Sequence, residues 1–183
     1  DAERSRFELA EPGRYEGGFR RFAEAMARAL ALAAAAYQRD GKLSGISTGL
    51  RDLDQRLGGL QHSDLIILAG RPGMGKTSLA TNIAFNVAKA YRFEVEPDGS
   101  HKTTNGGIVG FFSLEMSADQ LATRIVAEQA EIPSYKIRRG DLREDEFYKL
   151  TQAAQEIQAL PLYIDDTGGL SIVQLAARAR RLK

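Results

Sequence analysis

The sequence has 183 residues, of which 43% are hydrophobic and 27% are charged, so it is long enough for one sizeable globular core with room for a small appendage. Its 25 basic and 24 acidic side chains give a net charge of +1, so binding of nucleic acid would have to come from a local patch or from several assembled copies. The absence of cysteine excludes disulfides and thiolate metal sites, and two isolated histidines argue against a zinc cluster.

The N-terminal part of the chain is predicted to form a linker and then a helix. Residues 1–18 mix glycine, proline and charges without apolar periodicity, which is typical of a flexible linker. Residues 19–38 are rich in alanine and predict a helix with one apolar stripe. The stripe consists of Phe19, Phe22, Met26, Leu30, Ala33, Ala34 and Tyr37. The stripe could pack on its own domain or, if the helix is a connector, on a neighbouring subunit.

The same helix contains the uncharged run 29–38, but ten residues are too few to span a bilayer. We therefore expect neither membrane insertion nor secretion, and we expect a cytoplasmic location. The chain begins at Asp1 rather than at a methionine, so we expect it to be part of a longer product.

Residues 65–77 contain the most informative pattern of the sequence. After short glycine-containing turns at 44–64, the apolar run 65–69 predicts a buried parallel strand covered on both faces. The run leads into residues 70–77, which match the phosphate-binding pattern Gly-x-x-x-x-Gly-Lys-Thr. Helical spacing then predicts a helix, and one face of it is formed by Leu79, Ala80, Ile83, Ala84 and Val87.

Each fixed position of this loop has a chemical role. Gly70 and Gly75 allow backbone torsions that other residues resist, so successive N–H groups can form a concave site for an anion. Lys76 supplies a point charge for the outer phosphates, the Thr77 hydroxyl can ligate magnesium, and the helix that follows adds its positive dipole end. The predicted nucleotide-binding residues are Gly70, Arg71, Pro72, Gly73, Met74, Gly75, Lys76, Thr77 and Ser78.

Three segments follow the loop and its helix. Residues 93–106 are polar and contain turn residues, which predicts an exposed hairpin or a mobile loop. Residues 107–113 predict a second buried strand. Ser117 and Gln120 then match a capping box, which predicts a helix that ends near Ala130.

The C-terminal part is predicted to add a helix, a strand and a last helix. The apolar face of the first helix consists of Phe147, Leu150, Ala154, Ile157 and Leu160. Residues 162–166 predict a short third strand, and Ser171 and Gln174 match the capping box of the last helix. The inward face of that helix consists of Ile172, Leu175, Ala176, Ala179 and Leu182. The alternation predicts an α/β fold with parallel strands and a ligand site at their carboxyl ends.

Charged residues beyond the strands are candidates for the chemistry. Glu115 is either a general base that activates water or an ordinary acid near a helix N-terminus. Asp165 and Asp166 are either a magnesium site or a pair that bonds a turn. A basic cluster on the last helix is either a contact for nucleic-acid phosphates or a solvated face, and it consists of Arg178, Arg180, Arg181 and Lys183.

Five segments together resemble the bacterial replicative DNA helicases of the DnaB family. They are 47–54 (STGLRDLD), 70–77 (GRPGMGKT), 112–117 (FSLEMS), 140–142 (GDL) and 162–167 (LYIDDT). They occur in order and at similar spacing, and the resemblance extends over residues 19–183. The phosphate loop alone is common to many ATPases, whereas Ser-Leu-Glu-Met after the second strand is more specific.

The resemblance implies a RecA-like P-loop ATPase domain at residues 42–183, truncated at its C-terminus and preceded by a linker helix at residues 19–41. It implies ATP and Mg²⁺ as ligands, with Glu115 and Lys76 as catalytic residues. It also implies a homohexameric ring, joined through the linker helix at 19–38, that moves on single-stranded DNA and unwinds the duplex at the replication fork. Primase and a helicase loader are the further partners that it implies.

The resemblance weakens the magnesium interpretation of Asp165 and Asp166, because the family carries its magnesium aspartate on a following strand. The DNA-binding loops and the arginine finger also lie beyond residue 183, so we expect the isolated chain to hydrolyse ATP poorly or not at all. Two other classes stay open from the residues alone. One is another RecA-like ATPase, of the recombinase or clock type, and the other is a nucleotide-sensing assembly module.

Overall fold

The computed structural model describes residues 19, 21–38 and 43–182, which belong to two compact units that divide between residues 42 and 43. The predicted linker at 1–18 and Lys183 of the basic cluster lie outside the described residues. In the first unit, α2 (Phe22–Gln38) confirms the predicted helix, and the large side chains of its apolar stripe are exposed. None of the described helices is long and apolar enough to cross a membrane.

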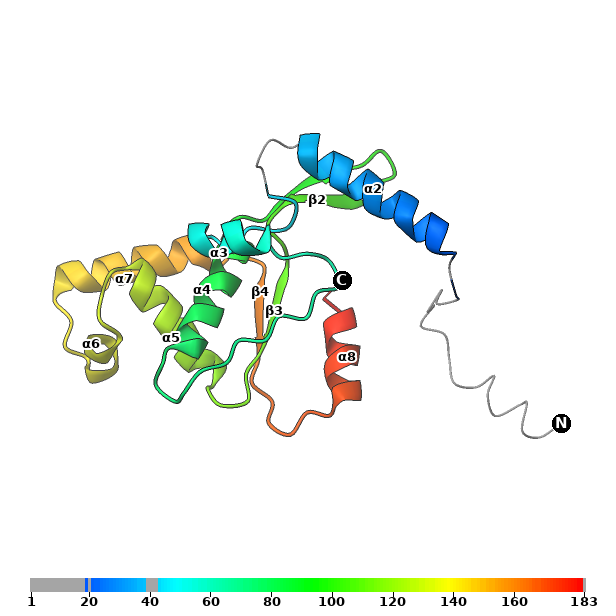
Figure 1. Cartoon of the computed structure of the whole chain (residues 1–183). Coiled ribbons are helices and arrows are strands. Elements are labelled where there is room, and N and C mark those ends of the chain that lie inside the picture. The colour runs from blue at the N-terminus through cyan, green and yellow to red at the C-terminus, as the bar shows by residue number, and fades with distance from the viewer. Residues whose placement is uncertain (1–18, 20, 39–42, 183) are drawn as a thin grey trace. The chain divides into compact units, whose positions relative to one another are not determined.

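The second unit is built on a parallel pair of strands, β3 (Val109–Phe112) and β4 (Leu162–Asp165). This confirms the second and third predicted strands and their parallel direction. The helices α4 (Lys76–Lys89) and α5 (Ala118–Gln129) lie on one side of the strands, and α8 (Ile172–Arg180) lies on the other (Figure 1). The residues that α4 buries are Thr81, Ala84, Phe85, Val87 and Ala88.

The apolar run 65–69 does not form the predicted buried strand. These residues have no regular secondary structure, and the side chains of Leu65 and Ile67 are 87% and 80% exposed. A strand needs neighbouring strands to bond its N–H and C=O groups, and in the described part of the chain β3 and β4 pair only with each other. Apolar composition therefore did not suffice to make this segment a strand.

Residues ahead of the phosphate loop fold around one buried carboxylate. Asp54 lies in α3 (Arg51–Leu57), a short helix where the sequence predicted only turns. It accepts hydrogen bonds from the hydroxyl of Ser47 at 2.6 Å and from the amide and hydroxyl of Thr48, both at 2.8 Å. The carbonyl oxygen of Thr48 accepts from Nδ2 of Asn86 in α4 at 3.0 Å. The segment is therefore fixed to the helix that follows the loop.

The helices α5, α6 (Ser134–Arg139) and α7 (Glu144–Ile157) pack together beside the strands. The capping box of α5 is confirmed, because Ser117 and Gln120 each bond the other's backbone N–H. The sequence did not predict α6, whose six residues are too few for a strong periodic signal. The buried residues at the centre of this group are Ala130, Ile132 and Ala153.

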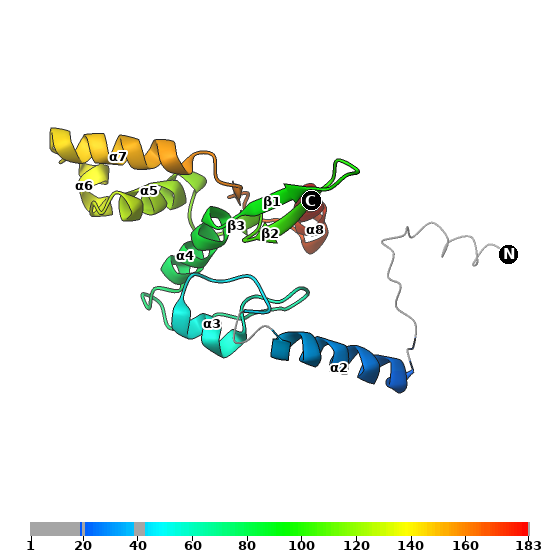
Figure 2. The same cartoon turned by 90° about the horizontal axis from the view of Figure 1, so that it is seen from above.

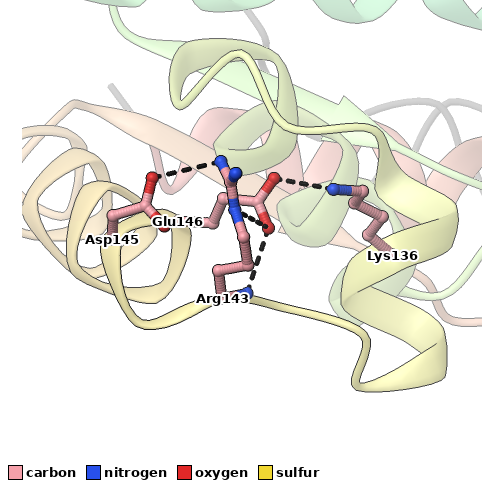
Figure 3. A network of polar contacts seen from close by, with 4 residues as sticks. All are labelled: Lys136, Arg143, Asp145 and Glu146. Atoms are coloured by element: carbon pink, nitrogen blue, oxygen red, sulfur yellow. Dashed lines mark hydrogen bonds and ion pairs between the residues drawn. The ribbon is translucent and has the colours of Figure 1, made fainter.

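The buried face of α7 agrees only in part with the predicted one, in that Leu150 packs against the buried cluster and Ile157 and Leu160 are half-buried. Phe147 and Ala154 are exposed, whereas Glu146 is buried. A charged residue can lie on this face because its carboxylate accepts from Nζ of Lys136 at 2.7 Å and from the backbone N–H of Arg143 at 3.0 Å (Figure 3). The contact with Lys136 lowers the pKa of Glu146, and the same contact raises the pKa of Lys136. Both groups therefore keep their charges over a wide pH range.

The strands β1 (Arg92–Val95) and β2 (His101–Asn105) confirm the hairpin predicted over 93–106. Both strands are exposed along their length, and the rings of Phe93 and His101 stack with centroids 4.3 Å apart. The hairpin projects away from α5, α6 and α7 (Figure 2). It is therefore held mainly by its own ladder and by this cross-strand stack.

The last helix confirms the capping box of Ser171 and Gln174, but its predicted inward face only in part, since Ala176 and Leu182 are half-buried. Ile172 is exposed, and none of the described residues of α8 is buried. Leu182, just after the helix, lies against Gly110 of β3, and the guanidinium of Arg178 donates to the carboxylate of Asp165. Amphipathic spacing alone therefore did not decide which face of α8 is covered.

Candidate active site

The glycines of the phosphate loop hold the torsions that shape it. Gly75 is the N-cap of α4 with a φ of 86°, and Gly73 has a φ of 77°. Gly70 is not in the positive-φ region, so the predicted special torsion is confirmed for Gly75 and wrong for Gly70. A Cβ added at Gly73 or Gly75 would meet no atom within 4 Å. Glycine is therefore favoured at these positions by the positive φ and not by lack of space for a side chain. N–H groups at such a bend can line an anion site.

Lys76 folds over this loop. Its Nζ donates to the carbonyl oxygen of Gly70 at 3.0 Å and to that of Arg71 at 3.4 Å. Both partners are neutral, so these contacts do not cancel the charge of the ammonium group. Thr77 follows in the first turn of α4, where its carbonyl oxygen accepts from the hydroxyl of Thr81 at 2.7 Å. The loop thus presents a cation and a threonine on adjacent positions.

One cavity of about 380 Å³ joins the start of α4 to the end of β3. Its lining includes Leu68, Lys76, Thr77, Phe112, Ser113 and Glu115. The structure therefore brings Glu115 together with Lys76 and Thr77, from which it is far apart in the sequence. The other predicted nucleotide-binding residues are outside this lining, and the hydroxyl of Ser78 accepts from Nη1 of Arg124 at 3.3 Å instead.

Glu115 lies on an exposed turn between β3 and α5, and Ser113 closes this turn. The hydroxyl of Ser113 donates to the carbonyl oxygen of Met116 at 2.6 Å and accepts from the N–H of Met116 at 3.1 Å. Ser113 is buried, so the turn is anchored beneath while Glu115 reaches the cavity. The sequence analysis missed this role of Ser113. Its signal was a small hydroxyl residue directly after a strand, which favours local bonds to the backbone.

The two acids at the end of β4 are both bonded by protein groups. Hydrogen bonds from Arg178 and then from Thr167 lower the pKa of Asp165 to about 2. The carboxylate of Asp166 accepts from the backbone N–H of Ala118 at 2.9 Å. These contacts fit the second alternative left by the sequence, a pair that bonds the surrounding turns. Since Arg178 is paired with Asp165, it is not a free contact for nucleic-acid phosphates.

A glycine-rich loop at the N-terminus of α4, beside a parallel strand pair with an acid just beyond β3, is typical of the class of P-loop nucleoside triphosphatases. The comparisons with known proteins narrow this class. The chain belongs to the DnaB-like helicase family, because the family profile described as "DnaB-like helicase C terminal domain" matches residues 45–183. Membership of this family implies that the domain uses a nucleotide.

Two relatives named "Replicative DNA helicase DnaB" illustrate the similarity. The protein from Rickettsia typhi is 43% identical over 182 residues, and that from Geobacillus stearothermophilus is 35% identical over 183 residues. Both alignments cover 100% of this chain but only 36% and 37% of the relatives. The chain therefore spans little more than a third of the length of these relatives.

Two solved structures share the fold. One, described as an ATPase domain, superposes with a TM-score of 0.72 at 26% identity and covers 91% of this chain and 53% of that one. The other, described as "The Structure Of A DnaB-Like Replicative Helicase And Its Interactions With Primase", gives a TM-score of 0.71 at 25% identity and covers 100% of this chain and 39% of that one. Both confirm the predicted RecA-like α/β class.

Proposed function

We propose that this chain supplies part of the ATP-driven motor of a replicative DNA helicase. In this proposal the motor is a homohexameric ring that moves on single-stranded DNA and unwinds the duplex at the replication fork, in the cytoplasm. The observation that carries the proposal is the cavity shared by Lys76, Thr77 and Glu115. A phosphate loop alone would suit any nucleotide-binding protein, whereas an acid beside it suits one that hydrolyses the nucleotide.

The residues of the site have three different roles in this proposal, namely phosphate binding, Mg²⁺ binding and proton acceptance. Lys76 and the N–H groups of residues 73–75 bind the outer phosphates of ATP, and the uncancelled charge of Lys76 and the bend at Gly75 support this role. Thr77 offers its hydroxyl to Mg²⁺, which when bound screens the negative charge of the phosphates. Glu115 takes a proton from the attacking water as it approaches the phosphate.

Glu115→Gln tests this assignment. The amide keeps the size of the side chain but cannot accept the proton, so we expect ATP binding to persist while turnover falls by about 10²- to 10⁴-fold. Binding and turnover are measured in the longest natural chain that contains this sequence. Glu94→Gln in β1, an exposed glutamate in the hairpin, is the matched control and should leave both unchanged. Normal turnover by Glu115→Gln would remove Glu115 from the site.

The helicase assignment is tested by the response of hydrolysis to DNA. We expect single-stranded DNA to stimulate hydrolysis by the same natural chain, and we expect Lys76→Ala to abolish it, because the phosphates lose their point charge. Hydrolysis that does not respond to DNA would contradict a DNA motor and would favour another RecA-like ATPase.

We also propose that residues 42–183 form part of the motor domain and that the helix at 19–38 joins subunits of the ring. The exposed stripe of α2 supports this role, because large apolar side chains in one row favour a partner surface. Leu30→Glu should lower the mass of the assembly in light scattering, whereas Arg28→Glu, on the same helix but off the stripe, should not. Primase and a helicase loader are proposed partners of the whole protein, and one structural relative is described with its primase interactions.

A further inference from the structure

The motif at the end of β4 has two acids, and the hydrolytic chemistry above uses neither. Asp165 is bonded by Arg178 of α8. Asp166 bonds a different helix, α5, because its Oδ2 accepts from the backbone N–H of Ala118 at 2.9 Å. Ala118 is the first residue of α5, and the two partners are far apart in the sequence. The contact therefore joins two elements that only the tertiary fold brings together.

The N–H of Ala118 is one that the capping box of α5 leaves unbonded. In that box Ser117 bonds the N–H of Gln120, and Gln120 bonds the N–H of Ser117. The first N–H groups of a helix have no partner within the helix, so the N–H of Ala118 needs an acceptor from elsewhere. A carboxylate is a favourable one, since it also lies at the positive end of the helix dipole.

The contact lies at one end of the turn that carries Glu115, and the neighbouring residue of β4 holds the other end. The backbone N–H of Ser113 donates to the carbonyl oxygen of Asp165 at 2.9 Å, which continues the parallel ladder past Phe112. Two consecutive residues thus fix both ends of the segment 113–118, Asp165 through its backbone and Asp166 through its side chain. Within the segment, the hydroxyl of Ser113 closes the turn.

We propose that Asp166 is a positioning residue for ATP hydrolysis, which holds the turn so that Glu115 faces the cavity beside Lys76. The inference rests on the proposed role of Glu115 as general base. Asp166 acts by accepting a hydrogen bond, so its charge is secondary and it does not bind the metal. Displacement of a reacting group by about 1 Å can cost about 10²-fold in rate, so one contact at the base of this turn can control turnover.

Two variants remove the same hydrogen bond from opposite sides. Asp166→Ala removes the acceptor. Ala118→Pro removes the donor at a first helical position, where proline is tolerated, and Ser117 before it already has the extended backbone (φ −68°, ψ 159°) that proline requires. We expect both to lower kcat by about 10- to 100-fold with little change in KM for ATP. Asp166→Asn keeps an oxygen acceptor and should restore most of kcat.

The measurements are kcat, KM for ATP, the Mg²⁺ concentration at half-maximal rate and the melting temperature, in the longest natural chain that contains this sequence. Asp98→Ala is the matched control, because its carboxylate accepts from a backbone N–H (Ser100, 2.9 Å) in the remote hairpin. It should leave kcat unchanged. If Asp166→Ala does not fold, the kcat of Ala118→Pro by itself tests the positioning role.

Three results would overturn the inference or locate the failure elsewhere. Normal kcat in Ala118→Pro, with Glu115→Gln inactive, refutes the positioning role and leaves the proposed function intact. An Asp166→Asn variant as slow as Asp166→Ala, with a raised Mg²⁺ requirement, also refutes it and assigns Asp166 to the metal. Normal turnover in Glu115→Gln removes Glu115 from the site, so it refutes the premise of the inference, whereas the DNA-driven motor is tested separately by the response of hydrolysis to DNA.

Discussion

Asp54→Ala removes the acceptor on which three donors converge ahead of the phosphate loop. Asp54 is 6% exposed and Thr48 is fully buried, so water cannot replace the lost acceptor for the amide and hydroxyl of Thr48. Each buried donor left unbonded costs about 1–3 kcal/mol, whereas the half-buried hydroxyl of Ser47 can turn to solvent. We therefore expect the free energy of unfolding to fall by about 4 kcal/mol, a large share of the roughly 5–15 kcal/mol of a typical domain.

Urea denaturation followed by far-UV circular dichroism measures this loss, since the sequence contains no tryptophan for a fluorescence assay. Asp52→Ala is the matched control. Asp52 lies in the same first turn of α3 but is exposed, so its removal tests the effect of the helix dipole alone, about 0.3–1 kcal/mol. A loss in Asp54→Ala no larger than that of the control would refute the reasoning.

The difference in the free energy of unfolding between the natural chain and Asp54→Ala should also depend on pH, which is a second check. Burial acts to raise the pKa of Asp54, but the hydrogen bonds from Ser47 and Thr48 outweigh it and lower the pKa. A lowered folded-state pKa means that the contribution is complete above the unfolded-state pKa and is lost as the pH falls through the folded value. The stability difference between the natural chain and Asp54→Ala should therefore narrow in acid. A difference that stays constant down to low pH would show that the carboxylate charge is not its source.

Two further predictions concern the loop and the sheet. Gly75→Ala should weaken ATP binding and cost about 1–2 kcal/mol of stability, whereas Gly140→Ala, with a similar φ (71°) and open space, should cost as much stability but leave binding unchanged. Equal ATP affinity in both variants would contradict the role of the bend. Because Arg178, followed by Thr167, holds the pKa of Asp165 at about 2, against an ordinary 3.8, the stability that this pair contributes should be lost between about pH 4 and pH 2. Urea titrations at a series of pH values measure this loss, and in Asp165→Asn the fall in the free energy of unfolding between pH 4 and pH 2 should be absent. A fall of the same size in the variant would contradict the role of the pair.

Local signals in the sequence determined several features of this protein. The loop pattern, the two capping boxes and the helix α2 could be predicted because each depends on neighbouring residues, whose torsions and hydrogen bonds are settled within a few positions. Short helices were missed for the complementary reason. A six- or seven-residue helix such as α6 or α3 is marginal by itself and forms here through contacts from outside it, such as those around Asp54.

Only the tertiary structure decided the remaining features, because they depend on partners distant in the chain. The run 65–69 is apolar enough for a strand, but a strand also needs neighbours that complete its backbone hydrogen bonds. Glu146 lies on the buried face of α7 because Lys136 compensates its charge. The cavity joins Glu115 to Lys76, and the acids of β4 bond Arg178 and Ala118, because the parallel pairing of β3 and β4 brings these segments to one edge.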